Sequence, residues 1–377
     1  MKINKRAVLL VLILPVVLAL GGCWDAKELD DLAIPLVGAY DMILENEKAY
    51  PDDKYLVTVG VPVFYKDVKE KFHIVETSGK TSGEARGRRN SELGAQVIFG
   101  QLQLLIFGED VGKESNLLEI IDSITRNPSV KSSLYVAIAK GRAVDLIKRP
   151  IHDYPNMAIY LKALLENSRN SNFYPYTTLF QLNRESISYE SAAIIPHVVF
   201  EDGDIMLAGS CLINKGKTAA ELGREETETA VLLRGIECRG DITFDIVEND
   251  KVIDQATFEG SNKRKVKLQI KDGRYIFNIR INLDGIIIEH KKQVPVQDGT
   301  DYMKLFKESL EKNIRKRAEA FVEKTQDEFK IDTLCLAKYV KGNTREKLTK
   351  DDIDNIIKDA EINVEVEAKI RNAGGKM

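Results

Sequence analysis

Residues 241–290, DITFDIVENDKVIDQATFEGSNKRKVKLQIKDGRYIFNIRINLDGIIIEH, decide the fold of the C-terminal third. The runs of β-branched and aromatic residues in this stretch are typical of strands. They are separated by three turn-forming groups, Asn249-Asp250, Lys271-Asp272-Gly273 and Asp284-Gly285. Because Asn, Asp and Gly adopt the left-handed backbone that tight turns require, the stretch predicts an antiparallel meander.

A long amphipathic helix is predicted after the meander, over residues 301–326. Its apolar side chains recur every four residues, at Tyr302, Phe306, Leu310, Ile314, Ala318 and Val322. This spacing places them on one face, which we expect to pack on the meander. Two shorter helices, about 331–340 and 351–357, precede a last strand at 362–370, whose alternation fits one buried face. The C-terminal domain is therefore predicted to be an antiparallel sheet packed with long helices.

The preceding sequence alternates between strand-like and helix-like segments. Strands are predicted at 54–65, 72–77, 102–107 and 134–139, and helices at about 82–98, 116–125, 143–148, 157–167, 177–183 and 219–233. Two further apolar runs, 193–200 and 205–213, flank an Asp202-Gly203 pair, which indicates a hairpin. The whole pattern predicts an α+β protein of several domains, with mixed α/β domains before the C-terminal sheet and helices.

The length and the charge suggest where the domains divide. At about 150 residues per domain, 377 residues suggest two or three domains. Residues 201–255 carry 6 basic and 13 acidic side chains, whereas residues 256–330 carry 17 and 12. We expect an N-terminal domain at 23–200, a small middle domain at 201–255 and a C-terminal domain at 256–377. The charge shift has two interpretations: two differently solvated surfaces, or an acidic and a basic segment that face each other or a partner.

The first 22 residues are predicted to be a signal peptide that is removed from the mature protein. Lys2, Lys5 and Arg6 precede an uncharged stretch at 7–20. A membrane-spanning helix needs about 20 apolar residues, so this stretch is too short to be one. A positive leader, an apolar segment and small residues are the pattern of an export signal.

Leu20-Gly21-Gly22-Cys23 resembles a bacterial lipobox. Cleavage after Gly22 would leave Cys23 at the amino terminus, carrying S-diacylglycerol and an N-acyl chain. The alternative is an ordinary secretory signal followed by a chance cysteine. Removal of the three basic residues takes the formal net charge from -3 to -6, so anionic headgroups would not attract the mature chain. The acyl chains would hold it, because two buried chains bind a membrane stably.

The sequence points to no enzyme and no cofactor beyond the covalent lipid. It has no P-loop, no G-x-S-x-G and no H-E-x-x-H. The four histidines, His73, His152, His197 and His290, are far apart, so each is interpreted as an ordinary surface or core residue rather than a metal ligand. A nearly balanced charge, with 55 Lys and Arg against 58 Asp and Glu, excludes nucleic-acid binding through bulk charge.

The remaining cysteines and two basic runs each leave alternatives open. Cys211 and Cys238 could form a bridge, or these two and Cys335 are unpaired and buried. The run at 83–89, GEARGRR, is either a solvated helix face or a binding site for a phosphate or an acidic partner. The run at 262–267, NKRKVK, either protects a sheet edge or contacts anionic lipid or another protein.

Several stretches resemble the Ger(x)C family, the C-subunit lipoproteins of bacterial spore germinant receptors. The most specific is Gly22-Cys23-Trp24-Asp25, followed by Glu28-Leu29 and Asp31-Leu32. The resemblance continues through Thr77-Ser78-Gly79-Lys80-Thr81, VIFG at 97–100, Arg126-Asn127-Pro128 and LYVAIAKGRAVDLI at 134–147. Gln101 stands where the family often has a histidine. The resemblance covers essentially the whole chain.

The resemblance implies a non-catalytic ectodomain of three mixed α/β domains. It also implies that Cys23 anchors this ectodomain to the outer face of the cell membrane, which in the spore is the inner membrane. It implies that the subunit works with the A and B membrane subunits of a germinant receptor, which respond to small nutrients. It leaves open whether this subunit itself contacts a nutrient. The alternatives are a solute-binding lipoprotein of an importer, which would need two similar α/β lobes, and a lipid-anchored hydrolase, which would need a catalytic constellation.

Overall fold

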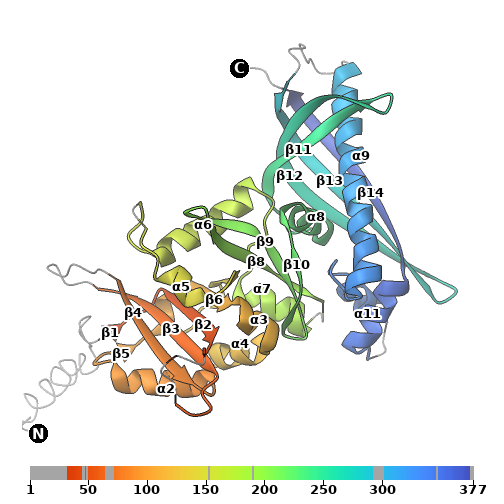
Figure 1. The fold of residues 1–377 in the computed structure, drawn as a ribbon. Coiled ribbons are helices and arrows are strands. Elements are labelled where there is room, and N and C mark those ends of the chain that lie inside the picture. The colour runs from red at the N-terminus through yellow and green to blue at the C-terminus, as the bar shows by residue number, and fades with distance from the viewer. Residues whose placement is uncertain are drawn as a thin grey trace, which may run out of the picture.

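The computed structural model describes residues 32–44, 47, 50–63, 72–151, 153–188, 191–291, 301–344 and 347–373. These residues form two modules, each built on its own sheet (Figure 1). The N-terminal module, within residues 32–222, contains an eight-stranded sheet, and the C-terminal module, within residues 224–373, contains a four-stranded sheet. The two modules lie at opposite ends of an elongated molecule, and α8 (Arg224–Arg234) lies where they meet.

The eight-stranded sheet has a parallel centre and antiparallel flanks. Its order is β10-β9-β8-β7-β6-β2-β3-β4. The strands are β2 (Val37–Met42), β3 (Tyr55–Pro62), β4 (Phe72–Gly79), β6 (Leu104–Gly108), β7 (Tyr135–Ala139), β8 (Ala193–Glu201), β9 (Asp204–Asn214) and β10 (Lys217–Leu222). Strands β2, β6, β7 and β8 run parallel to one another. A small parallel pair, β1 (Leu32–Ala33) and β5 (Gln96–Val97), lies beside this sheet.

Helices cover both faces of the eight-stranded sheet. One face packs against α2 (Ser82–Glu92), α3 (Glu109–Glu114), α4 (Leu117–Thr125) and α7 (Leu179–Asn183). The other packs against α5 (Ala143–Ile147) and α6 (Met157–Ser171). Two short irregular helices, η2 (Phe99–Gln101) and η3 (Arg184–Ser188), complete the module. Burial on both faces explains why the central strands are continuously apolar, as in β6, where every residue is buried.

The predicted meander is present in the C-terminal module. Strands β11 (Arg239–Glu248), β12 (Lys251–Lys271) and β13 (Arg274–His290) pair antiparallel in sequence order. Strand β14 (Glu361–Ala373) adds to β13, but in the parallel direction. A parallel partner requires a crossover connection, and the helices between β13 and β14 supply it. The sheet is therefore antiparallel over three strands and mixed at its last edge.

Asp284-Gly285 does not form the predicted turn, because β13 runs through it. Gly285 pairs with Gly260 of β12, and a Cβ on Gly285 would lie 2.1 Å from the carbonyl oxygen of Glu259. The glycine therefore allows a close approach of two backbones next to a register shift.

The predicted long helix is α9 (Asp301–Lys324), which packs along the C-terminal sheet (Figure 1). Its stripe is the core face, since Phe306, Leu310, Ile314 and Ala318 are each 0% exposed. The chain continues through η4 (Thr325–Phe329), α10 (Ala337–Asn343) and α11 (Lys350–Asp359).

The sheets do not follow the expected domain boundaries at 200/201 and 255/256. The first boundary lies inside the β8–β9 hairpin, where Glu201 pairs with Asp204. The second lies inside β12. Residues 201–255 therefore build no sheet of their own: their first part completes the eight-stranded sheet, and their last part begins the four-stranded one. The expected boundaries follow the change in side-chain charge, whereas backbone pairing determines which strands share a sheet.

One part of the acidic segment 201–255, helix α8, faces one part of the basic segment 256–330, helix α9, which agrees there with one interpretation of the charge shift. On α8, Glu228 pairs with Arg317 of α9 at 2.9 Å, and Glu226 pairs with Lys324 at 2.7 Å. Burial raises the pKa of the Glu228 carboxyl, and Arg317 opposes that effect. These pairs connect α8 to α9.

Candidate functional site

The predicted lipidation residues, Gly22 and Cys23, lie outside the described residues, which begin at Leu32. Cleavage after Gly22 and acylation of Cys23 therefore stay predictions. Among the helices of the described residues, none is both long enough and apolar enough to span a membrane.

The three cysteines of the described chain are buried and free. Cys211 belongs to the core of the N-terminal module and Cys238 to that of the C-terminal module, so the bridge left open by the sequence is not formed. Burial raises the pKa of both thiols to about 12. Because a thiolate is the reactive form, these side chains are suited to packing rather than to nucleophilic chemistry.

The described histidines are not brought together. His73 is exposed on β4, His197 is buried in β8, and His290 lies beside the rings of Tyr302 and Phe306. His152 lies outside the described residues. The described residues contain no group of three His, Cys, Asp or Glu side chains that could hold a metal ion.

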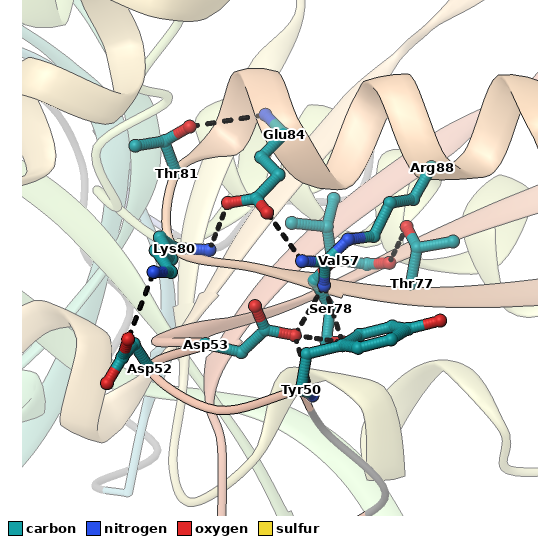
Figure 2. A network of polar contacts seen from close by, with 10 residues as sticks. All are labelled: Tyr50, Asp52, Asp53, Val57, Thr77, Ser78, Lys80, Thr81, Glu84 and Arg88. Carbon is teal, nitrogen blue, oxygen red and sulfur yellow. Dashed lines mark hydrogen bonds and ion pairs between the residues drawn. The ribbon is translucent and has the colours of Figure 1, made fainter.

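The strongest candidate site is built around α2, which carries the basic run 83–89. Thr81 caps the helix by accepting a hydrogen bond from the backbone N–H of Glu84 at 3.2 Å. Arg88 ties the helix to the turn before β3 and to the end of β4, since it donates to the carboxylate of Asp53 and to the carbonyl oxygen of Ser78 (Figure 2). A carboxylate and a guanidinium held in this way fix the position of the helix.

Asp53 and Gly79 make this attachment specific. Burial alone would raise the pKa of Asp53, but hydrogen bonds from Arg88, Ser78 and the Tyr50 backbone outweigh it and hold the pKa below its usual value. The ring of Tyr50 lies under the Arg88 guanidinium, 4.3 Å from its centroid. A Cβ on Gly79 would lie 2.6 Å from the backbone nitrogen of Ala85, so only glycine allows α2 to approach the end of β4 this closely.

Arg89, the next residue, is directed into the protein rather than into solvent. It is 2% exposed, so the interpretation of residues 83–89 as a solvated helix face is wrong at this position. Ser82, Ala85 and Arg89 are spaced at i, i+3 and i+7, and all three are buried. That spacing is the signal in the sequence that could have identified Arg89 as inward-facing.

Arg89 lines a cavity of about 40 Å³ between α2, η2, the end of α4 and strands β2 and β3. Burial lowers the pKa of its guanidinium, which nevertheless stays protonated at neutral pH. Arg86 lines the same cavity. Tyr40 and Ser82 also line it, and their hydroxyl oxygens are hydrogen-bonded at 2.7 Å. The arrangement can hold a small anion.

A second polar cluster lies at the carboxyl ends of the parallel strands. Asp41, at the end of β2, accepts hydrogen bonds from the backbone N–H groups of Ala143 and Val144 at 2.7 and 2.9 Å. Glu109, which follows β6, accepts one from Gly141 at 2.9 Å. Both carboxylates thus hold the turn after β7, within the block LYVAIAKGRAVDLI. Their hydrogen bonds are used to build the fold.

A third cluster joins the two modules. Arg234 of α8 is 4% exposed and donates to Glu185 and to the carbonyl oxygen of Thr333. Asp332 is 0% exposed and accepts the hydroxyl of Ser191, just before β8, at 2.7 Å. Its carboxylate also accepts backbone N–H groups at the start of α10. A core cluster containing residues of both modules surrounds this junction.

The basic run 262–267 lies inside β12. Strand β11 pairs with β12 only as far as Ser261. Beyond this residue, β13 is the one described strand that pairs with β12, so the other edge of β12 is free there. Lys263, Lys265 and Lys267 are exposed along this free edge, as the edge interpretation expected. Arg264 instead points inward and donates to the carbonyl oxygens of Leu233 and Leu334.

Two protein-family models, both of spore germination proteins, match successive parts of the chain. Residues 25–199 match the model of the spore germination protein N-terminal domain. Residues 208–374 match the model described as spore germination B3/GerAC like, C-terminal.

Similar proteins extend this result over nearly the full length. Spore germination protein GerQC of Bacillus cereus is 25% identical over 342 residues, covering 90% of this chain and 92% of the relative. Spore germination protein B3 of Bacillus subtilis (strain 168) is 22% identical over 373 residues, covering 95% of each. The crystal structure of the GerBC protein shares the fold, with a TM-score of 0.55 and 18% identity over 92% of this chain and 100% of that one. This chain belongs to the Ger(x)C family.

Proposed function

We propose that this protein is the lipid-anchored C subunit of a nutrient germinant receptor, and that it is needed to trigger spore germination without catalysing a reaction. The observation that carries the proposal is that the chain matches both family models and nearly the whole length of relatives named as spore germination proteins. Its partners are the A and B membrane subunits, and its place is the outer face of the spore inner membrane.

The anchor in this proposal is the lipid on Cys23. Eight residues, 24–31, lie between Cys23 and Leu32, the first residue of β1, so the two are nine residue steps apart. An extended chain spans at most about 3.3–3.6 Å per residue, so β1 lies within about 30 Å of the lipid. In Figure 1, β1 lies at the end of the molecule that carries α2, β3 and β4, far from α9 and β14. The N-terminal module is therefore the part held near the membrane.

The junction between the modules supports a coupling role. A shared core and buried hydrogen bonds at Glu185, Arg234 and Asp332 connect the membrane-proximal module to the distal one. A body joined in this way can pass a displacement from one end to the other, as a subunit of a signalling assembly requires.

The importer alternative requires two similar α/β lobes. The two modules differ in strand number and direction, since one has a parallel centre with helices on both faces and the other is a meander with one added strand. This difference favours the receptor proposal.

Replacement of the anchoring residue tests the proposal. We expect Cys23→Ala to leave the membrane fraction of the spore-former and to reduce germination with one class of nutrients, while germination by other triggers is retained. Cys335→Ala is the matched control and should behave like the wild type, because Cys335 is a buried core thiol. Normal membrane retention together with normal germination of the Cys23→Ala strain would contradict the proposal. Normal germination combined with failed solute import in a deletion strain would favour the importer.

A further inference from the structure

We propose that the cavity between α2, η2 and strands β2 and β3 binds the carboxylate group of a small organic acid, and that Arg89 is the residue that pairs with it. The inference does not rest on the proposed receptor function. It rests on three features of the cavity: an unpaired buried cation, a lining without negative charge, and a volume that fits a short carboxylate.

The first feature is the state of Arg89. Its Nε and Nη1 atoms are buried and have no hydrogen-bond partner among the described residues. The ring of Phe99 lies 5.2 Å from the guanidinium carbon, but a ring face does not satisfy N–H donors. A buried charge without a partner is strongly unfavourable, so proteins pair such groups.

The other inward-facing arginines of the described chain show the usual solution. Arg234 donates to Glu185 and to a backbone carbonyl, and Arg264 donates to two backbone carbonyls. Arg89 differs in having neither a carboxylate nor a carbonyl acceptor among the described hydrogen bonds. An anionic ligand would supply the missing acceptors, and a carboxylate matches the fork of a guanidinium.

The second feature is the charge of the lining. Arg86 and Arg89 are its charged members, and no carboxylate belongs to the described residues that line the cavity. The two guanidinium groups repel each other, and one bound anion would relieve the repulsion. Tyr40 and Ser82 share one hydrogen bond, so one hydroxyl hydrogen of the pair is left to donate to a ligand.

The third feature is size and polarity. A cavity needs roughly 10–15 Å³ of space open to the centre of a water molecule in order to hold one water. The cavity at Arg89 has about 40 Å³ of such space, which is enough for roughly three waters. The remaining lining is mainly apolar, including Val57, Val59 and Leu105. A planar carboxylate with a short apolar chain, such as propionate, satisfies both ends of the cavity. Inorganic phosphate would place a strongly hydrated anion against apolar walls, which is costly.

The attachment of α2 prepares the cavity for this ligand. Arg88 fixes the helix on Asp53 and the carbonyl oxygen of Ser78, and Thr81 caps it (Figure 2). The helix that carries Arg89 is therefore held in place before a ligand arrives. A preorganised group loses less freedom on binding.

Thermal unfolding of the purified chain with sodium propionate tests the inference, with sodium chloride and sodium phosphate at matched ionic strength as comparison salts. Propionate should raise the unfolding midpoint of the wild type in a saturable manner and more than either comparison salt. Arg89→Met should unfold at a higher temperature than the wild type without propionate, because a buried charge is removed, and should not respond to propionate.

Arg126→Gln is the matched control. Arg126 is 77% exposed and follows α4, so its loss removes one positive charge near the cavity without touching the lining. It should respond to propionate like the wild type. If Arg89→Met does not fold, Arg89→Lys keeps the charge but lacks the planar fork, and it should bind propionate about tenfold more weakly.

Three outcomes would overturn the inference. One is a wild type that responds equally to propionate and chloride. Another is a propionate response that persists in Arg89→Met, or at full affinity in Arg89→Lys. The third is a larger response to phosphate than to propionate, which would assign the cavity to inorganic anions.

Discussion

Asp41 is a buried carboxylate whose titration should be visible in the stability of the protein. Burial raises its pKa to about 6, although hydrogen bonds from Ala143 and Val144 oppose the shift. In an unfolded chain an aspartate has a pKa of about 3.9. Between these two pH values the folded state keeps a proton that the unfolded state has released. The free energy of unfolding therefore falls as the pH rises from about 4 to about 6.

We predict that Asp41→Asn flattens this pH dependence. The wild type should lose up to about 3 kcal/mol of stability across the window through this residue, and the variant should not. Urea unfolding at pH 4.5 and pH 7 measures the difference. Asp145→Asn is the control, because Asp145 lies exposed on α5, the helix that Asp41 holds. Equal pH dependence in Asp41→Asn and the wild type would show that Asp41 does not titrate in this range.

Two glycines near α2 give a matched pair of opposite predictions. Gly79→Ala should lower the free energy of unfolding by about 1–3 kcal/mol, because the new Cβ would lie 2.6 Å from the backbone nitrogen of Ala85. Gly87→Ala should be neutral or raise it by up to about 1 kcal/mol, because Gly87 lies in the interior of α2 with nothing within 4 Å of the added Cβ. Denaturant unfolding of both variants measures these changes. Equal changes in the free energy of unfolding would show that the close approach of α2 to Gly79 does not require a glycine.

At the scale of elements, the contact between α8 and α9 depends on one partly buried ion pair. Arg317 and Glu228 are 13% and 15% exposed. Arg317→Met should lower the free energy of unfolding by about 2–3 kcal/mol, because Glu228 is left without its cation. Adding Glu228→Gln should recover much of the loss. Arg315→Met, on the exposed side of α9, should change stability by less than about 0.5 kcal/mol. A loss of equal size in Arg315→Met would contradict a specific role for the pair.

The more exposed pair, Lys324 with Glu226, should contribute little. Its side chains are 32% and 36% exposed, and such pairs are worth about 0–1 kcal/mol and are screened by salt. The apolar face of α9 carries the rest of the contact, and salt does not screen it.

The elements that the sequence predicted best are those with a complete periodic signal. The four-residue spacing in α9 identified its buried face, because a helix presents such residues on one side. The β8–β9 hairpin followed from Asp202 and Gly203, both of which adopt positive φ. The turn predicted at Asp284-Gly285 was wrong. A glycine that permits close approach of two backbones looks the same in a sequence as one that forms a turn.

The candidate site was harder to predict than the fold. The composition of residues 83–89 indicates a solvated helix, and only their phase relative to Ser82 and Ala85 shows that Arg89 faces inward. The cavity also needs Tyr40 from β2 and Phe99 from η2, which only the tertiary fold brings together. The direction of β14 likewise depends on how the chain crosses over, which local patterns do not encode.

At the scale of the whole molecule, the buried junction should make the two modules unfold together. Arg234→Met would leave the Glu185 carboxylate, 10% exposed, with only the more distant Arg184 at 3.9 Å, and should lower the free energy of unfolding by about 3–5 kcal/mol. Because the loss falls on the contact between the modules, we expect calorimetry to show two separated transitions where the wild type shows one. Arg224→Met is the control, since Arg224 is exposed at the start of α8. One unchanged transition in Arg234→Met would mean that the junction does not couple the modules.

The proposal that this family member works at a membrane surface depends on its amino terminus. Mass spectrometry of the intact protein purified from its own spores tests this most directly. We expect a chain that begins at Cys23 and carries the added mass of a diacylglyceryl group and an N-acyl chain. A chain that keeps residues 1–22, or one that begins with an unmodified Cys23, would contradict it.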